Sequence, residues 1–358
     1  MAYQLALGPF GTVWRGPQRI SLHVDDERIT EIELRDGYAA RDCAVRLLRL
    51  DLRNTAPLVS RICGVHGHHH LLAWTLALEA IAGLEVPPRA QVLRLLVAEG
   101  ERVASHVHAA AGVVELLGLE LVHTTLLKLH EATLQGLQML TGQRCVHEFA
   151  LPGGVQHDLH SDEVRALRAL LGKQERELRQ VIEGLIHTRG LSTRTGGIGT
   201  LSATLMAQFA VRGVFARAAG SSTDIRRDAP YAGYDVWQPR LVQQRGGDVQ
   251  SRLFIWLLES YESISLAQRL LQELPEGLWR GDPLDSLPEG SATVEVEAPT
   301  GPLRYMLRSD GVQLTEVIID GPQLADRWLL RALLVGQAAE DGPLVIASLA
   351  SCVTCAEA

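Results

Sequence analysis

The chain has 358 residues, of which 46% are hydrophobic and 21% charged, so it is long enough for one large domain or two ordinary ones. A formal net charge of −8 without a basic run argues against a nucleic-acid partner. The five cysteines are too few and odd in number for a disulfide framework, and they indicate a reducing compartment. Without a signal-like start or an apolar stretch of the ~20 residues that a membrane span needs, we expect a soluble, cytoplasmic chain.

The first predicted elements are a β-hairpin and a helix. Apolar and polar side chains alternate in residues 20–24 and again in residues 29–34, and the acidic residues between them favour a turn. Residues 41–58 are mixed apolar and basic, and they predict one helix that ends at Pro57.

Long helices are predicted for the middle of the chain. Apolar side chains recur at helical spacing in residues 71–82, 90–117, 121–140, 163–186 and 249–274. Successive apolar helices favour a bundle. After a Pro/Gly/Asp linker the pattern alternates, and it predicts strands at residues 294–296, 303–307 and 312–319 and a closing helix at residues 323–338.

Two short motifs near opposite ends of the chain carry metal-binding chemistry. Cys63 and His66 form a Cys-x-x-His pair, and Cys352 and Cys355 form a Cys-x-x-Cys pair. Residues three apart on a turn can point at one ion, and three thiols with one imidazole suit a thiophilic transition metal. Either pair alone is also compatible with a redox pair, a solvated loop or chance, so the metal-site interpretation requires that the two pairs meet.

The surroundings of both motifs resemble a known family. Residues 61–64 and 346–355 resemble the two metal-binding signatures of nickel–iron hydrogenase large subunits, most closely those of the membrane-associated, energy-converting group. That group shares ancestry with the quinone-site large subunit of respiratory complex I. The resemblance continues in order along nearly the whole chain, at residues 85–90, 101–106, 152–155, 224–231, 247–249 and 297–299.

This resemblance implies a mainly α fold, a hydrogenase large-subunit-like helical bundle with small antiparallel β-sheets near both termini. A single domain would span residues 1–358. It would comprise an N-terminal β-hairpin region (1–40), the bundle (41–274) and a C-terminal β region with a helix and the metal-binding tail (289–358). The resemblance also implies that the first motif and the tail meet at one end of the bundle and face a small iron–sulfur subunit.

The sequence departs from both related groups at functional positions. His66 stands where the hydrogenases have a fourth cysteine, Thr300 where they have an arginine, and Gly16 where they keep a proton-relay glutamate. Splitting H₂ releases a proton and needs a base near the metal, so these losses bear on ordinary hydrogenase turnover. In the complex I comparison, the quinone-contacting tyrosine corresponds to Gly64 and the quinone-contacting histidine falls near Arg15.

Metal ligands usually have partners that orient them. We expect this role for Arg61 and for His70, which matches a histidine of the family, and we expect Asp224 and Arg226 to line the cavity. A plain structural arginine is the alternative for Arg61, and a solvated loop is the alternative for the last two. The remaining expectations are a polar loop for His68 and His69, an ion-pair network with a proton path as the lesser alternative for Glu99, Glu101 and Arg102, and buried apolar positions for Cys43 and Cys145.

Three functions follow as hypotheses. The first is the large subunit of a multi-subunit oxidoreductase that exchanges electrons with a small iron–sulfur subunit, with H₂ and protons as substrates if a nickel–iron centre is built. The second is a complex-I-like quinone or coupling subunit with a degenerate metal site. The third is a non-catalytic subunit with a closed Cys₃His zinc site. Membrane antiporter-like subunits are further expected partners, so the chain would lie on the cytoplasmic face of the inner membrane. No flavin or dinucleotide site and no catalytic residue are recognised.

Overall fold

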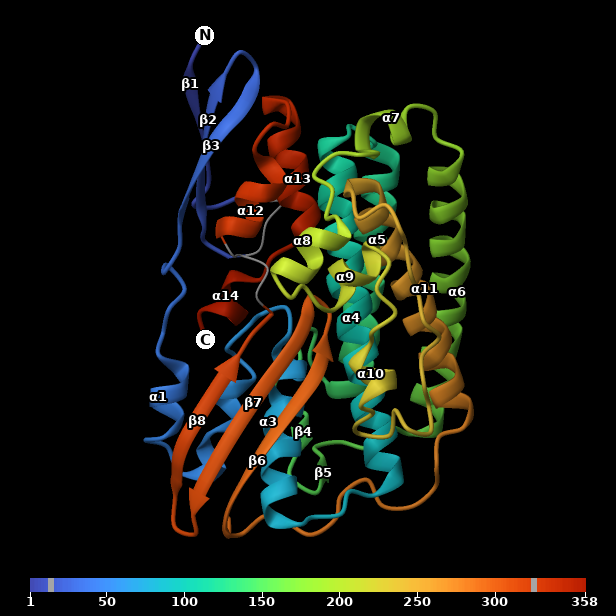
Figure 1. The fold of residues 1–358 in the computed structure, drawn as a ribbon. Helices are drawn as coiled ribbons and strands as arrows, with labels where there is room; N and C mark the ends of the chain where they lie inside the picture. The colour runs from blue at the N-terminus through green and yellow to red at the C-terminus, as the bar shows by residue number, and fades with distance from the viewer. Residues whose placement is uncertain (12–15, 323–326) are drawn as a thin grey trace.

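The computed structural model describes residues 1–11, 16–322 and 327–358, and it is organised around one long helix (Figure 1). This helix, α4 (Pro88–Leu116), packs against α5 (Glu120–Thr141) and α11 (Val249–Gln272). Its side chains are buried on nearly every face, as expected for a helix at the centre of a bundle. The outer helix α6 (Ser161–Ile186) is amphipathic and covers α5 and α11.

Most of the predicted long helices are confirmed. The helix α3 (Gly67–Ala82) begins four residues before the predicted start and ends at Gly83, whose φ of +64° suits a glycine that terminates a helix. The segment 41–58 differs from the prediction, because it forms α1 (Cys43–Leu47), a 3₁₀ turn (Leu52–Asn54) and α2 (Ala56–Val59) in place of one helix.

Two three-stranded antiparallel sheets lie near the two ends of the chain. The predicted hairpin is confirmed as β2 (Arg19–Asp25) and β3 (Arg28–Arg35), and the unpredicted β1 (Tyr3–Leu7) pairs with β2. The second sheet has the strand order β6 (Glu289–Ala298), β7 (Gly301–Asp310), β8 (Leu314–Asp320). The short strands β4 (Ala150–Leu151) and β5 (Gly154–Val155) form a separate antiparallel pair. The mainly α fold with small antiparallel sheets near both termini is therefore confirmed.

The C-terminal sheet positions the start of α3. The strands β6 and β7 pack on α3, where the ring of Trp74 meets that of Tyr305 edge to face at 6.2 Å. On the other side, α13 (Gly342–Leu349) packs against α4 and α11. The tail that follows it, with α14 (Val353–Ala356), is thereby brought to the N-terminal end of α3 (Figure 1).

Short helices fill the region between α6 and α11 and the segment before α13. They are α7 (Leu191–Thr195), α8 (Ala203–Gln208), α9 (Val214–Ala218), α10 (Ile225–Asp228) and α12 (Arg327–Leu334). The predicted start of the closing helix at Gln323 lies outside the described residues. None of the helices in the described ranges combines the length and apolarity needed to cross a bilayer.

Candidate metal centre

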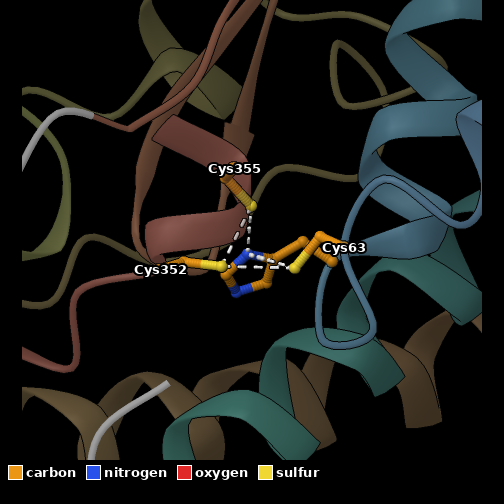
Figure 2. Close-up of side chains that lie close together, drawn as sticks. Cys63, Cys352 and Cys355 are labelled. Carbon is orange, nitrogen blue, oxygen red and sulfur yellow. Dashed lines mark hydrogen bonds between the residues drawn. The ribbon is translucent and has the colours of Figure 1, made fainter. Parts of the chain in front are cut away.

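The two motifs meet. Cys63 lies in the turn between α2 and α3, and its Sγ is 3.2 Å from that of Cys352, 289 residues away in the sequence. Cys355 Sγ is 3.1 Å from Cys352 Sγ and 3.3 Å from His66 Nδ1. One ligand atom from each of the four residues lies within 4.8 Å of the other three, and all four are buried. Figure 2 shows the side chains of Cys352 and Cys355 pointing toward Cys63.

The C-terminal tail is held by contacts on both of its sides. The carboxylate of Glu357 accepts hydrogen bonds of 2.7 Å from the backbone N–H groups of Gly37 and Ala39. The tail also packs against Gly321, the residue that follows β8. The two backbones approach so closely that a Cβ at residue 321 would lie 2.0 Å from the carbonyl oxygen of Cys355. Only glycine fits at such a distance, so the sequence at residue 321 permits the tail to pack against the sheet.

The thiols of the cluster differ in acidity. Hydrogen bonds from Cys355 and Cys63 hold the pKa of Cys352 well below its ordinary value. Burial raises the pKa of Cys355 well above its ordinary value. Cys352 therefore ionises before Cys355, and the thiolate is the form that binds metals.

The donor set fits one thiophilic ion. Three thiolates and an imidazole nitrogen form a recognised set for zinc, and the same donors bind nickel. They fit a hydrogenase-type dinuclear nickel–iron centre poorly, because His66 replaces one of the four thiolates that the resemblance implies. A neutral imidazole nitrogen has one lone pair for a metal, whereas a bridging thiolate shares several. The residues present therefore match a site for one ion rather than two.

Two further side chains hold the cluster in place. His70, predicted to orient the ligands, contacts Cys355 Sγ through Nε2 at 3.3 Å and the hydroxyl of Tyr305 through Nδ1 at 2.7 Å. Burial lowers the pKa of His70 to about 3, so its imidazole is neutral. In the tautomer that suits a metal-bound thiolate, Nε2 carries the N–H and points it at the sulfur, and Nδ1 accepts from the hydroxyl of Tyr305. His66 Nε2 in turn lies 3.3 Å from Ser105 Oγ on α4.

Arg61, Asp224 and Arg226 contact other groups. Arg61 donates to Glu148 Oε1 at 2.8 Å and to the carbonyl of Pro57 at 2.9 Å, and half of its side chain is exposed. Asp224 and Arg226 are buried and paired with each other at 2.6 Å, which contradicts the solvated-loop alternative. Among the interactions of the described residues, none joins these three side chains to the four ligand atoms. The orienting role of Arg61 and the cavity-lining role of Asp224 and Arg226 remain predictions.

A buried network of charges lies on α4 and its neighbours, as expected for Glu99 and Arg102. Glu99 is fully buried and contacts the guanidinium of Arg226 at 3.2 Å and that of Arg102 at 3.5 Å. Farther along, Arg217 pairs with Glu259 at 2.6 Å. Buried charges persist only when they are paired in this way.

The sequence expectations for three residues are wrong. His68 and His69 are fully buried in the first turn of α3 and do not form a polar loop. Their backbone N–H groups donate to the carboxylate of Glu101, which offsets the cost of burying this polar turn. Cys145, expected to be buried, is exposed, whereas Cys43 is buried as expected. The sequence predicts a strand at Tyr305 but not its contact with His70, because no local pattern indicates that partner.

Several positions at which the sequence departs from the two related groups lie close to the tail, in the core or beside the ligands. A Cβ on Gly16 would lie 3.1 Å from the Cβ of Val353, so the segment that lacks the relay glutamate adjoins the tail. Thr300 is buried, and its hydroxyl has no hydrogen-bond partner among the described residues. Gly64 lies in the turn between the first two ligands. Arg15 lies outside the described residues.

The chain is similar in sequence to known proteins along most of its length. A family model described as nickel-dependent hydrogenase matches residues 46–110, and one described as the 49 Kd subunit of respiratory-chain NADH dehydrogenase matches residues 117–286. The carbon monoxide-induced hydrogenase of Rhodospirillum rubrum is 30% identical over 357 residues, which cover 99% of both proteins. Formate hydrogenlyase subunit 5 of Escherichia coli is 29% identical over 98% of this chain and 62% of its own length.

The similarity extends to NADH-quinone oxidoreductases and to a solved structure. An NADH-quinone oxidoreductase subunit of Clostridium beijerinckii is 27% identical over 96% of this chain and 94% of its own. A chain in the structure of the membrane-bound sulfane sulfur reductase, an archaeal respiratory membrane complex, superimposes with a TM-score of 0.93 at 27% identity and covers 100% of this chain. The fold and these relatives define an oxidoreductase subunit. The chain belongs to the family that unites nickel-dependent hydrogenases with the 49-kDa subunit of NADH dehydrogenase, as the resemblance implied.

Proposed function

We propose that this chain is the large subunit of a membrane-associated oxidoreductase complex and that Cys63, His66, Cys352 and Cys355 bind one thiophilic metal ion. The observation that carries the metal proposal is the convergence of four buried donor atoms within 4.8 Å, contributed by segments almost 290 residues apart. In this proposal residues 1–358 act as one domain, because both ends of the chain supply ligands to one site.

The residues around the cluster have defined tasks. The ion supplies Lewis acidity or a redox couple when bound, and the chain supplies three thiolates in a water-poor environment. The N–H that His70 directs at Cys355 stabilises negative charge on that sulfur, and Tyr305 fixes the orientation of the imidazole. The tail is held by Glu357, so its thiols remain beside Cys63.

A small iron–sulfur subunit and antiporter-like membrane subunits are the proposed partners, on the cytoplasmic side of the inner membrane. Support comes from relatives named as subunits of formate hydrogenlyase and of NADH-quinone oxidoreductase, and from a similar chain in a respiratory membrane complex. Affinity purification of the chain from solubilised membranes, followed by mass spectrometry and iron analysis, tests this. Recovery without any iron–sulfur protein contradicts the electron-transfer role.

Metal analysis of the purified complex tests the centre itself. We expect one nickel or zinc ion per chain, and we expect its loss in the double variant Cys352→Ser/Cys355→Ser. Cys145→Ser is the matched control, since Cys145 is an exposed thiol outside the cluster. Infrared bands of cyanide and carbon monoxide together with iron would show that a dinuclear centre is built after all and restore H₂ chemistry. Metal content that is equal in all three proteins would remove the metal proposal.

A quinone-coupled function is the second candidate. The 49-kDa family model covers residues 117–286, and one relative is named as an NADH-quinone oxidoreductase subunit. Quinone-dependent electron transfer that persists in the Cys352→Ser/Cys355→Ser complex would favour this candidate, with the cluster in a structural role. Loss of turnover together with the metal favours a redox or Lewis-acid role for the ion.

A further inference from the structure

A cavity of about 240 Å³ adjoins the Cys₃His cluster between α4, α5 and the turn before α3. Gly64 and Val65, which line it, lie between the ligands Cys63 and His66. Ser105 also lines it, and its hydroxyl is 3.3 Å from Nε2 of His66. The cavity therefore reaches the side of His66 that faces away from the thiols.

One carboxylate lines this cavity, that of Glu101. Its Oε2 lies 2.5 Å from Nδ1 of His69, and its two oxygens accept the N–H groups of His68 and His69 at 2.9 and 3.1 Å. With 7% of the residue exposed, Glu101 is buried but still touches the cavity. The carboxyl group thus stands between the interior of the bundle and a space large enough for several water molecules.

The surroundings favour proton exchange at Glu101. Burial raises its pKa above the ordinary value, and this effect exceeds the opposing effects of the charges of His68 and His66 and of the two backbone N–H groups. Burial likewise lowers the pKa of His69 well below its ordinary value. A carboxyl group whose pKa is displaced toward neutrality is suited to accept and release protons. The other charged or titratable groups facing the cavity are His108 on α4, His130 on α5, Arg144 and the thiol of Cys145.

We propose that Glu101 transfers protons between this cavity and the Cys₃His cluster. The proposal rests on metal binding at the cluster. When a protonated cysteine binds a divalent ion, its S–H bond breaks, the sulfur keeps the electron pair for the metal, and one proton leaves. That proton passes by way of the cavity water beside Ser105 to the carboxylate of Glu101, which then releases it to solvent. Gly16, where the resemblance places a relay glutamate, has no side chain to carry a proton, whereas Glu101 supplies a carboxylate from α4.

A purely structural role for Glu101 makes different predictions. Its carboxylate accepts backbone N–H groups in the first turn of α3, and such a contact stabilises a helix N-terminus. A glutamine at residue 101 keeps an oxygen acceptor for this cap but cannot exchange a proton at neutral pH. An aspartate keeps the acid but has a shorter reach. Stability and proton transfer can therefore be separated with Glu101→Gln and Glu101→Asp.

The test measures Co²⁺ loading of the metal-stripped protein by stopped-flow absorption of the cobalt–thiolate bands. General acid–base groups contribute ~10²–10⁴-fold to proton transfer. We expect Glu101→Gln to load at least about tenfold more slowly than the wild type at pH 7 and to reach the same final spectrum. Glu101→Asp should recover most of the rate, although its melting temperature falls as much as that of Glu101→Gln. Equal loading rates in wild type and Glu101→Gln, with normal cobalt spectra, overturn the relay and leave the metal site intact.

A second measurement addresses the cavity directly. Cys145 lines it and is the exposed cysteine among the five, so a bulky maleimide reacts there and obstructs the cavity. We expect alkylation to slow Co²⁺ loading several-fold, and we expect Cys145→Ser to be insensitive to the reagent. If alkylated wild type loads at the unmodified rate, the route through the cavity is wrong. Absence of any cobalt–thiolate band in the wild type would instead refute the metal centre, and the relay with it.

Discussion

Removal of the Glu357 carboxylate tests how the chain keeps its two halves of the site together. Glu357 accepts two N–H groups at 2.7 Å, from Gly37 and Ala39, of which the second is partly shielded from solvent. Hydrogen bonds to charged groups contribute about 1.5–3 kcal/mol each when well shielded. Since one of these is exposed, we take about 2–3 kcal/mol for the pair. If that energy is lost when the tail detaches, Glu357→Ala weakens metal binding by about 30- to 140-fold at ~1.4 kcal/mol per tenfold.

Competition with a chelator of known zinc affinity measures this effect. Glu357→Gln retains one acceptor oxygen and should lose about half of the free energy. Glu276→Ala, which removes an exposed carboxylate after α11, is the matched control and should bind as the wild type does. Urea unfolding of the metal-free proteins reports any general loss of stability. Zinc affinity of Glu357→Ala equal to that of the wild type would refute the reasoning and show that packing alone positions the tail.

Three further predictions concern the interior. Although burial opposes ionisation, Arg226 and other partners lower the pKa of Glu99 to about 2, so its contribution of about 3 kcal/mol is present above its unfolded pKa near 4 and is lost as the pH falls toward 2. Urea unfolding at several pH values should therefore show a penalty for Glu99→Gln that shrinks on acidification, and a penalty independent of pH would contradict this. Tyr305→Phe leaves Nδ1 of His70 without its donor and should cost about 1–3 kcal/mol. It should also weaken metal binding by ~10-fold or more in the chelator assay, whereas unchanged affinity would exclude an orienting role. Trp256→Ala empties a fully buried position in the core beside α4 and should cost about 3–5 kcal/mol by calorimetry, and a cost below ~1 kcal/mol would contradict the packing described.

The helices could be predicted because their signal is local. Apolar periodicity located α4, α5, α6 and α11 to within a few residues, since each buries a continuous face against its neighbours. The prediction of one helix for residues 41–58 was wrong because this segment has no consistent apolar period. Its turns are fixed by contacts with other parts of the chain, such as that of Arg41 with the carbonyl of Arg61 at 3.2 Å. The strand β1 was missed because its side chains are largely exposed and its position depends on pairing with β2.

The ligand set was predictable only with help from the family resemblance. Spacing alone identified each pair, but nothing local indicates that Cys63 and Cys352 approach to 3.2 Å. The burial of His68 was also beyond local reasoning. A run of histidines looks polar, and it is stabilised inside the protein by a carboxylate from another helix and by the carbonyl of Arg94, which lies 3.0 Å from Nε2 of His68. Such distant partners leave no spacing pattern in the sequence.

The separation of the ligands along the chain sets the order of events during biosynthesis. A ribosome adds about 5–20 residues per second, so roughly 15–60 s pass between the synthesis of Cys63 and that of Cys352, 289 residues later. During this interval the first cysteine and histidine are translated without their partners, and any metal they capture has an incomplete coordination shell. Loading of the complete site must therefore follow translation of Cys352 and Cys355, because only then are all four donors present.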